Sequence, residues 1–87
     1  MRIILPSNDK ISISEDFLKS NFFIVVSAGN GYIDFLETRQ NNVRDNPNEG
    51  QQIESLFNYL CDCQIIICKS IPKELSNKFK EMNIKVM

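Results

Sequence analysis

Three cysteines, Cys61, Cys63 and Cys68, are the side chains of this sequence with the most recognisable chemistry. Cys61 and Cys63 lie where an expected helix gives way to a strand, and Cys68 lies at the far end of that strand. An extended chain rises ~3.3 Å per residue, so Cys63 and Cys68 are about 16 Å apart and cannot share one metal ion. Two thiols are too few for a structural zinc site. We expect the cysteines to act as small apolar side chains; capture of a soft metal ion by Cys61 and Cys63 is the alternative.

The chain has no histidine. This absence excludes Ser–His and Cys–His nucleophile pairs, imidazole metal ligands and the side chain that best exchanges protons near neutral pH. No glycine-rich phosphate loop is present, because Gly50 is isolated. A metal nuclease of the ribonuclease H type would need an acidic residue on the first strand, which reads Arg-Ile-Ile-Leu over residues 2–5. We therefore expect no enzymatic activity.

Residues 68–72 place the start of a helix directly after a buried strand. A helix N-terminus at the carboxyl end of a strand attracts anions, and Ser70 and Lys69 could assist. A small-anion site at Ser70 is thus one hypothesis. The alternative is an ordinary joint between a strand and a helix, which has the same sequence pattern.

The elements that position these residues follow from hydrophobic periodicity. Gly29-Asn30-Gly31 supplies the positive-φ positions of a hairpin turn. Aromatic side chains around this hairpin (Phe22, Phe23, Tyr32, Phe35) are expected to fill the core rather than stack on nucleic-acid bases. Residues 39–48 are polar and predict a mobile loop. The predicted strands cover residues 2–5, 22–26, 32–38, 65–68 (a central strand) and 84–86, with a further short strand at residues 11–14.

Two amphipathic helices are predicted. The first begins at Asn46 or Asn48 and carries an apolar stripe of Ile53, Leu56, Phe57, Leu60 and Cys61. The second is capped by Ser70 or Ile71, with Pro72 near its first position, and ends at Asn83 in a left-handed conformation. Its buried stripe is Ile71, Leu75, Phe79 and Met82. Helix–strand–helix–strand order with short joints favours parallel strands and right-handed crossovers, and hence an α/β fold with a five-stranded mixed sheet.

Composition limits the range of partners. The 87 residues predict one domain, residues 1–87, with 43% hydrophobic residues and a net charge of −1. This charge offers no general attraction to nucleic acid. No apolar run approaches the ~18 residues that span a membrane, and no signal peptide is visible. We expect a cytoplasmic protein, in which an odd number of cysteines stays reduced.

Four stretches carry a resemblance to a known family. Residues 1–7 form a hydrophobic strand that ends in Pro6-Ser7. Residues 13–23 match in spacing a family stretch that reads Val-Ser-x-His-Phe-Gly-Arg-Ala before a strand. Residues 65–72 and 83–86 correspond to a glycine-rich strand–helix corner and a closing Gly-Ile-Lys-Val. The chain thus resembles the dinitrogenase iron–molybdenum cofactor biosynthesis family, the NifX-like and NifB C-terminal-like domains.

The resemblance implies a three-layer ribonuclease-H-like fold and a non-enzymatic carrier of iron–sulfur or molybdenum-containing clusters, with a cofactor-assembly protein as partner. It places Asp16, Phe17, Lys19 and Ser70 around the ligand cleft. Asp16 replaces the family histidine, Leu18 a glycine and Lys19 the arginine. Because a carboxylate is a harder ligand than imidazole, loss of cluster binding is an expectation. An interaction module without a ligand is the alternative function. The C-terminal helix of the family is absent after Met87, which predicts an uncovered sheet face and a homodimer.

Overall fold

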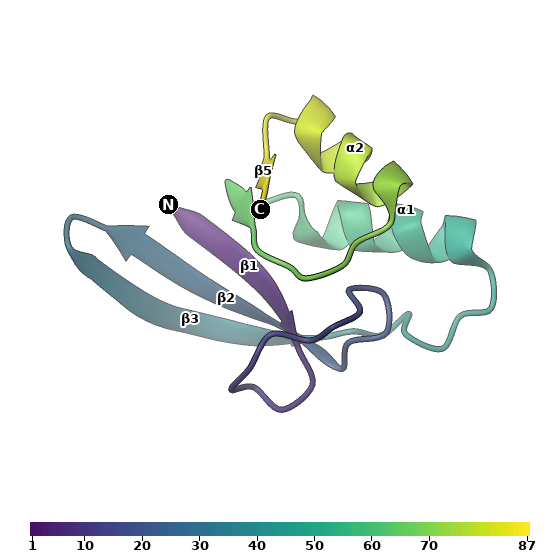
Figure 1. The fold of residues 1–87 in the computed structure, drawn as a ribbon, viewed down its shortest axis with the longest axis horizontal. Helices are drawn as coiled ribbons and strands as arrows, with labels where there is room; N and C mark the ends of the chain where they lie inside the picture. Colours follow the sequence, from purple (N-terminus) through teal and green to yellow (C-terminus); the bar gives the residue numbers. More distant parts are fainter.

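The computed structural model describes residues 1–87 as five strands and two helices (Figure 1). The strand order in the sheet is β3-β2-β1-β4-β5. The predicted α/β class, the five-stranded mixed sheet and the two helices are therefore confirmed. Neither helix has the length and apolarity needed to cross a lipid bilayer. The elements are β1 (Arg2–Ser7), β2 (Phe22–Gly29), β3 (Tyr32–Gln40), α1 (Glu49–Leu60), β4 (Ile65–Ile66), α2 (Lys73–Glu81) and β5 (Lys85–Val86).

The sheet joins an antiparallel half to a parallel half at β1. β1 pairs antiparallel with β2 and parallel with β4, where Ile3 lies beside Ile65 and Ile4 beside Ile66. β2 and β3 form the predicted hairpin, with Gly31 at a φ of +80° in its turn. Because β1, β3 and β4 run in the same direction, their carboxyl ends lie at one edge of the sheet. The loops that follow these three strands therefore meet there.

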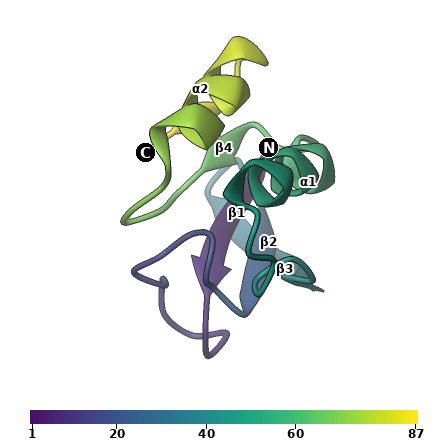
Figure 2. The same cartoon turned by 90° about the vertical axis from the view of Figure 1, so that its right-hand side faces the viewer.

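Both helices cover the same face of the sheet (Figures 1 and 2). Alternate strand residues such as Ile4, Val25 and Ile66 point into this layer, as the two-residue period of a strand requires. The helices contribute Ile53, Leu56 and Leu60 from α1 and Leu75 and Phe79 from α2. The core thus lies between one face of the sheet and the two helices, and the opposite face is the one that a third layer would cover.

One predicted strand does not form, and another is shorter than predicted. Residues 11–14 form no strand, because the Asp9 carboxylate accepts hydrogen bonds from the backbone N–H groups of Ile11 (2.9 Å) and Ser12 (2.8 Å) and folds this segment into a turn. The strand predicted at residues 65–68 is shorter, Ile65–Ile66, and lies inside the sheet between β1 and β5 as expected. Beyond it, Ile67 N–H still donates to the carbonyl oxygen of Ile4.

The helix ends agree with the sequence in part. Asn48 caps α1, since its side chain accepts a hydrogen bond from the N–H of Gln51, and Asn83 has the expected positive φ of 60°. The N-cap of α2 is Pro72 rather than Ser70 or Ile71. Met82 does not belong to the buried stripe, because the helix ends one residue earlier and the Met82 side chain is 57% exposed.

The hairpin aromatics and the polar loop also differ from expectation. Phe23 is fully buried, but Tyr32 and Phe35 are exposed and do not fill the core. β3 extends to Gln40, and the loop after it is anchored at Asn41. The buried side chain of Asn41 donates hydrogen bonds to two backbone carbonyls, which holds the start of the loop in place.

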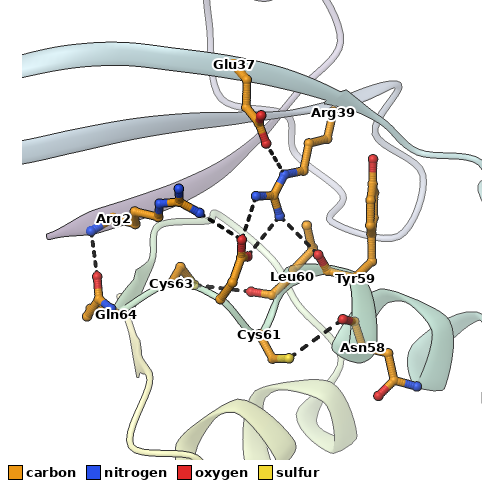
Figure 3. A network of polar contacts seen from close by, with 10 residues as sticks. Arg2, Glu37, Arg39, Asn58, Tyr59, Leu60, Cys61, Cys63 and Gln64 are labelled. Carbon is orange, nitrogen blue, oxygen red and sulfur yellow. Dashed lines mark hydrogen bonds and ion pairs between the residues drawn. The ribbon is translucent and has the colours of Figure 1, made fainter.

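A network of ion pairs joins β3 and β1 to the C-terminal end of α1 (Figure 3). The Arg39 guanidinium donates to both carboxylate oxygens of Asp62 (2.9 and 2.7 Å), to the Tyr59 carbonyl and to Glu37. Arg2 reaches the same Asp62 carboxylate at 2.9 Å. The hydrogen bonds from Arg39 hold the pKa of Asp62 below its usual range. The Asp62 carboxylate therefore links three elements that are distant in the sequence.

We expect Asp62→Asn to lower the free energy of unfolding by about 1–2 kcal/mol at pH 7, because it weakens charge-assisted hydrogen bonds to a guanidinium that is only 12% exposed. Because the folded-state pKa of Asp62 is lowered, this stabilisation is fully present above the unfolded-state pKa of about 4. It is lost as the pH falls through the folded-state pKa. Urea denaturation at neutral and acidic pH should show the difference between wild type and variant shrink on acidification. Asp45→Asn is the matched control; equal loss in both variants at pH 7 contradicts this role.

Candidate ligand cleft

A cleft of about 490 Å³ lies at the sheet edge where β1, β3 and β4 end. Its walls come from the loop after β1, the start of α1 and the joint between β4 and α2. Ligand sites of α/β folds form at this edge, outside the carboxyl ends of the strands. The lining residues are mostly polar: Asp16, Leu18, Lys19, Asn46, Pro47, Glu49, Gln52, Ser70, Ile71 and Pro72.

Phe17 anchors the loop that forms one wall of the cleft. Its ring is fully buried, with centroids 5.0 Å from Phe23 and 6.4 Å from Phe79. Its N–H donates to the carbonyl oxygen of Ser70 at 3.1 Å, which ties the loop to the joint before α2. Phe17 therefore belongs to the core and positions its neighbours, and it does not line the cleft itself.

Asp16 and Lys19 both line the cleft, on either side of this anchor. One carboxylate oxygen of Asp16 accepts hydrogen bonds from the N–H groups of Leu18 (3.0 Å) and Lys19 (3.2 Å), which closes a tight turn. The Lys19 ammonium lies 3.4 Å from the carbonyl oxygen of Arg44, and the Arg44 guanidinium donates to the Lys19 carbonyl at 2.8 Å. These contacts hold the turn against the loop before α1.

Gln52 is a buried polar side chain on the cleft wall, with only 2% of the residue exposed. Its amide nitrogen donates to the carbonyl oxygens of Leu18 at 3.0 Å and Arg44 at 3.4 Å. These two acceptors fix the orientation of the amide. Gln52 thereby connects α1 to both loops that border the cleft.

Ser70 lies at the third wall, immediately before α2. Because α2 begins after Pro72 without a side-chain cap, the N–H groups of its first turn have no side-chain acceptor. Lys69 does not join Ser70 in the cleft. It pairs with the Glu15 carboxylate at 3.1 Å on the exposed surface, so the assistance expected from Lys69 is absent.

The side-chain groups of the cleft that could ligate a metal ion are oxygen ligands, from Asp16, Asn46, Glu49, Gln52 and Ser70, and the cleft also holds the ammonium group of Lys19. No cysteine lines it, and no group of three His, Cys, Asp or Glu side chains could hold a metal ion. Iron in a cluster prefers thiolate or imidazole ligands, so these residues do not fit a directly ligated cluster.

The cysteines lie outside the cleft, and burial keeps the thiols of Cys63 and Cys68 protonated at neutral pH. Burial raises the pKa of Cys63 to about 11, and burial also raises the pKa of Cys68. Figure 3 shows that the Cys61 and Cys63 thiols point to different carbonyl oxygens, those of Asn58 and Leu60. A thiol must lose its proton to ligate a metal ion, so joint capture of a metal ion by Cys61 and Cys63 is disfavoured.

The structure thus brings together Asp16, Lys19 and Ser70 of the four residues that sequence reasoning placed at the cleft, and moves Phe17 into the core. Sequence reasoning missed Gln52. A signal existed, because Gln52 and Leu56 are four residues apart and share one face of the helix. A polar residue on an apolar stripe indicates a buried hydrogen-bonding role.

Comparisons with known proteins give a consistent result. The family model described as dinitrogenase iron-molybdenum cofactor matches residues 1–87. The crystal structure of PH0822 superposes with a TM-score of 0.75 at 19% identity, covering 100% of this chain and 75% of that one. An NMR structure described as a NifB protein from Thermotoga, of the DUF35 family, has a TM-score of 0.65 at 21% identity and covers 98% and 72%. At these identities the structures show a shared fold. A search of curated proteins found no match.

Replacing Gln52 by Leu should destabilise the protein by about 1–2 kcal/mol, because the carbonyl oxygen of Arg44 loses a buried donor and that of Leu18 keeps only Asn41. Gln51→Leu, at the exposed neighbouring position, is the matched control and should change stability little. Urea unfolding followed by circular dichroism measures both. If the two variants unfold at the same urea concentration, Gln52 does not hold the cleft walls together.

Proposed function

The chain belongs to the dinitrogenase iron–molybdenum cofactor family, and from this membership we propose a non-enzymatic relative of the cofactor carriers that has lost direct ligation of a metal cluster. The observation that carries the proposal is the donor set of the cleft. Asp16 stands where the family resemblance expects a histidine, and the other lining donors are hard oxygens and an ammonium. Such atoms suit soft cluster iron poorly.

The absence of a catalytic constellation supports the non-enzymatic part of the proposal. The chain has no histidine, and the cleft contains no nucleophile held by a neighbouring base. Proton transfer and covalent catalysis both need such a pair. The polar cleft and its rigid walls suit recognition of another molecule instead.

We infer that this molecule is a protein of cofactor assembly, which the cleft residues contact through polar groups. The three free thiols fit a role in the reducing cytoplasm. The alternative is a module that binds other proteins and no cofactor. The iron experiment below distinguishes such a module from a carrier.

Anaerobic incubation with ferrous iron and sulfide, followed by desalting, should leave wild-type protein without bound iron and without absorbance beyond the protein band. Asp16→His places an imidazole in the cleft and should retain more iron than wild type. Asp45→His adds an imidazole at an exposed position and is the matched control. A stable visible chromophore with stoichiometric iron on the wild-type protein contradicts the proposal.

A second candidate is a small-anion site at the start of α2. It is favoured by the uncapped first turn of α2 beside Ser70, with the Lys19 ammonium on the opposite wall of the cleft. N–H groups and the helix dipole attract anions at such a position. Asp16 and Glu49 line the same cleft and oppose a negative charge, so the anion would lie at the α2 end.

Phosphate at about ten times its dissociation constant should stabilise the protein by ~1.4 kcal/mol, which raises the Tm by several degrees for a domain of this size. Lys19→Gln should reduce this shift, whereas Lys80→Gln, at the far end of α2, should not. Thermal unfolding against phosphate, with chloride at equal ionic strength, measures the effect. A Tm that does not respond to phosphate rules out the anion site.

A further inference from the structure

The buried side chain of Gln52 has one polar atom that the protein leaves without a partner. Its amide nitrogen donates to the carbonyl oxygens of Leu18 and Arg44. A flipped amide would place its oxygen against these two carbonyl oxygens, so the contacts fix which end of the amide is the nitrogen. The amide oxygen, Oε1, accepts no hydrogen bond from the chain. Gln52 therefore offers one free acceptor, whose position is fixed from the nitrogen side.

The free oxygen of Gln52 faces the cleft. Only 2% of the residue is exposed, yet no side-chain nitrogen or oxygen of the chain is both buried and without a hydrogen-bond partner. Because Oε1 has no partner, it must be open to solvent, and the cleft is the one cavity that Gln52 lines. An unpaired acceptor on a buried residue at a cavity wall is a place where a ligand completes the hydrogen bond. The ligand group that fits is a donor.

Two carboxylates are neighbours of this amide. Glu49 precedes Gln52 by three residues on α1, so the two side chains share one face of the helix. The Asp16 carboxylate accepts from the N–H of Leu18, and the Gln52 amide donates to the carbonyl oxygen of the same residue, each at 3.0 Å. The backbone of Leu18 therefore has the Asp16 carboxylate at one end and the Gln52 amide at the other. All three side chains line the cleft.

Both carboxylates have acceptor atoms to spare. The hydrogen bonds to Asp16 use one of its oxygens, and none of the ion pairs of the chain includes Asp16 or Glu49. The one ammonium that lines the cleft is that of Lys19. It lies 3.4 Å from the Arg44 carbonyl oxygen, which the Gln52 amide nitrogen also contacts, and it forms no hydrogen bond with Oε1. The groups around Oε1 are therefore acceptors, with an excess of negative charge.

We propose that this wall of the cleft, formed by Asp16, Glu49 and Gln52, binds a primary ammonium group. We call these three residues the acceptor wall. An ammonium has three N–H donors and no acceptor, which matches an amide oxygen and two carboxylates. A guanidinium is a planar fork that suits bidentate contact with one carboxylate, and it matches acceptors from a loop and a helix less well. The inference deepens the proposed function and rests on it in one respect: the ammonium belongs to a lysine side chain of the partner protein.

The acceptor wall and the anion candidate at the start of α2 place opposite demands on Lys19. The Lys19 ammonium repels a cation in the cleft and attracts an anion. Lys19→Gln should therefore tighten the binding of an ammonium ligand, by about two- to fivefold for a solvated charge pair. The same variant should weaken the binding of phosphate, so one substitution separates the two ligands by the sign of its effect.

A titration of the full chain with two cations of equal charge tests the proposal. Ethylammonium has N–H donors and tetramethylammonium has none. Cations of this size bind with about millimolar dissociation constants at best, so the titration extends to roughly 100 mM at constant ionic strength. The NMR resonances of the Gln52 side-chain amide should shift and saturate with ethylammonium, and should not shift with tetramethylammonium.

Two variants and a peptide sharpen the test. Glu49→Gln should weaken ethylammonium binding about two- to fivefold, whereas Glu81→Gln, at the exposed end of α2, is the matched control and should bind like wild type. A Gly-Lys-Gly peptide with both ends blocked presents the same ammonium on a lysine side chain. Binding of this peptide at least as tight as that of ethylammonium supports a lysine of a partner protein; weaker binding contradicts that source.

Gln52 resonances that do not respond to ethylammonium overturn the proposal. An equal response to tetramethylammonium also overturns it, because charge without N–H donors would then account for binding. A response to Mg²⁺ and to neither ammonium ion would assign the wall to a metal ion and contradict it as well. These outcomes are separate from the iron experiment, since a stable cluster on the wild-type protein contradicts the proposed function whatever ethylammonium does.

Discussion

The burial of Phe17 is the constraint on which the cleft depends. A loop residue that places its whole ring among Phe23 and Phe79 cannot move without opening the core. Its N–H is bonded to the Ser70 carbonyl, so the same residue also fixes the distance between the loop after β1 and the start of α2. Asp16 and Lys19 flank Phe17 in the chain, so the fixed Phe17 ring holds both of them in place. The polar wall of the cleft therefore depends on a buried apolar side chain.

The parallel pairing of β1 and β4 provides the frame for this anchor. It brings together at one edge of the sheet the loops that hold Asp16 and Ser70, which are more than half the chain apart. Parallel pairing requires a crossover connection, and α1 supplies it with an apolar stripe that seals the core. Gln52 lies in the first turn of that helix and binds both neighbouring loops. Fold and cleft thus depend on the same helix.

Most of the fold could be predicted because it depends on local patterns. The strongest strand, the Gly31 turn, the Asn48 cap and the left-handed Asn83 are each visible in a few neighbouring residues. The errors arise where contacts between residues far apart in the sequence determine the structure. The motif predicts Phe17 at the cleft, but the ring is buried against Phe79, which lies far along the chain.

The hairpin and the second helix show the same limit. Phe35 alternates as a core strand residue would, yet its row lies on the uncovered side of the sheet. Alternation reveals that one face is apolar, but it does not reveal which face the helices cover. Met82 continues the helical spacing of its stripe, but the helix ends before the residue reaches the core.

Native-state hydrogen exchange at the Phe17 amide tests the central claim most directly. The account predicts that this N–H, although it lies in a loop, exchanges as slowly as core amides such as that of Val25, because exposing it requires the Phe17 ring to leave the core. Exchange as fast as at the amide of the exposed Lys69, which donates no hydrogen bond, would contradict the account. It would show that the loop moves freely and that the cleft has no fixed wall.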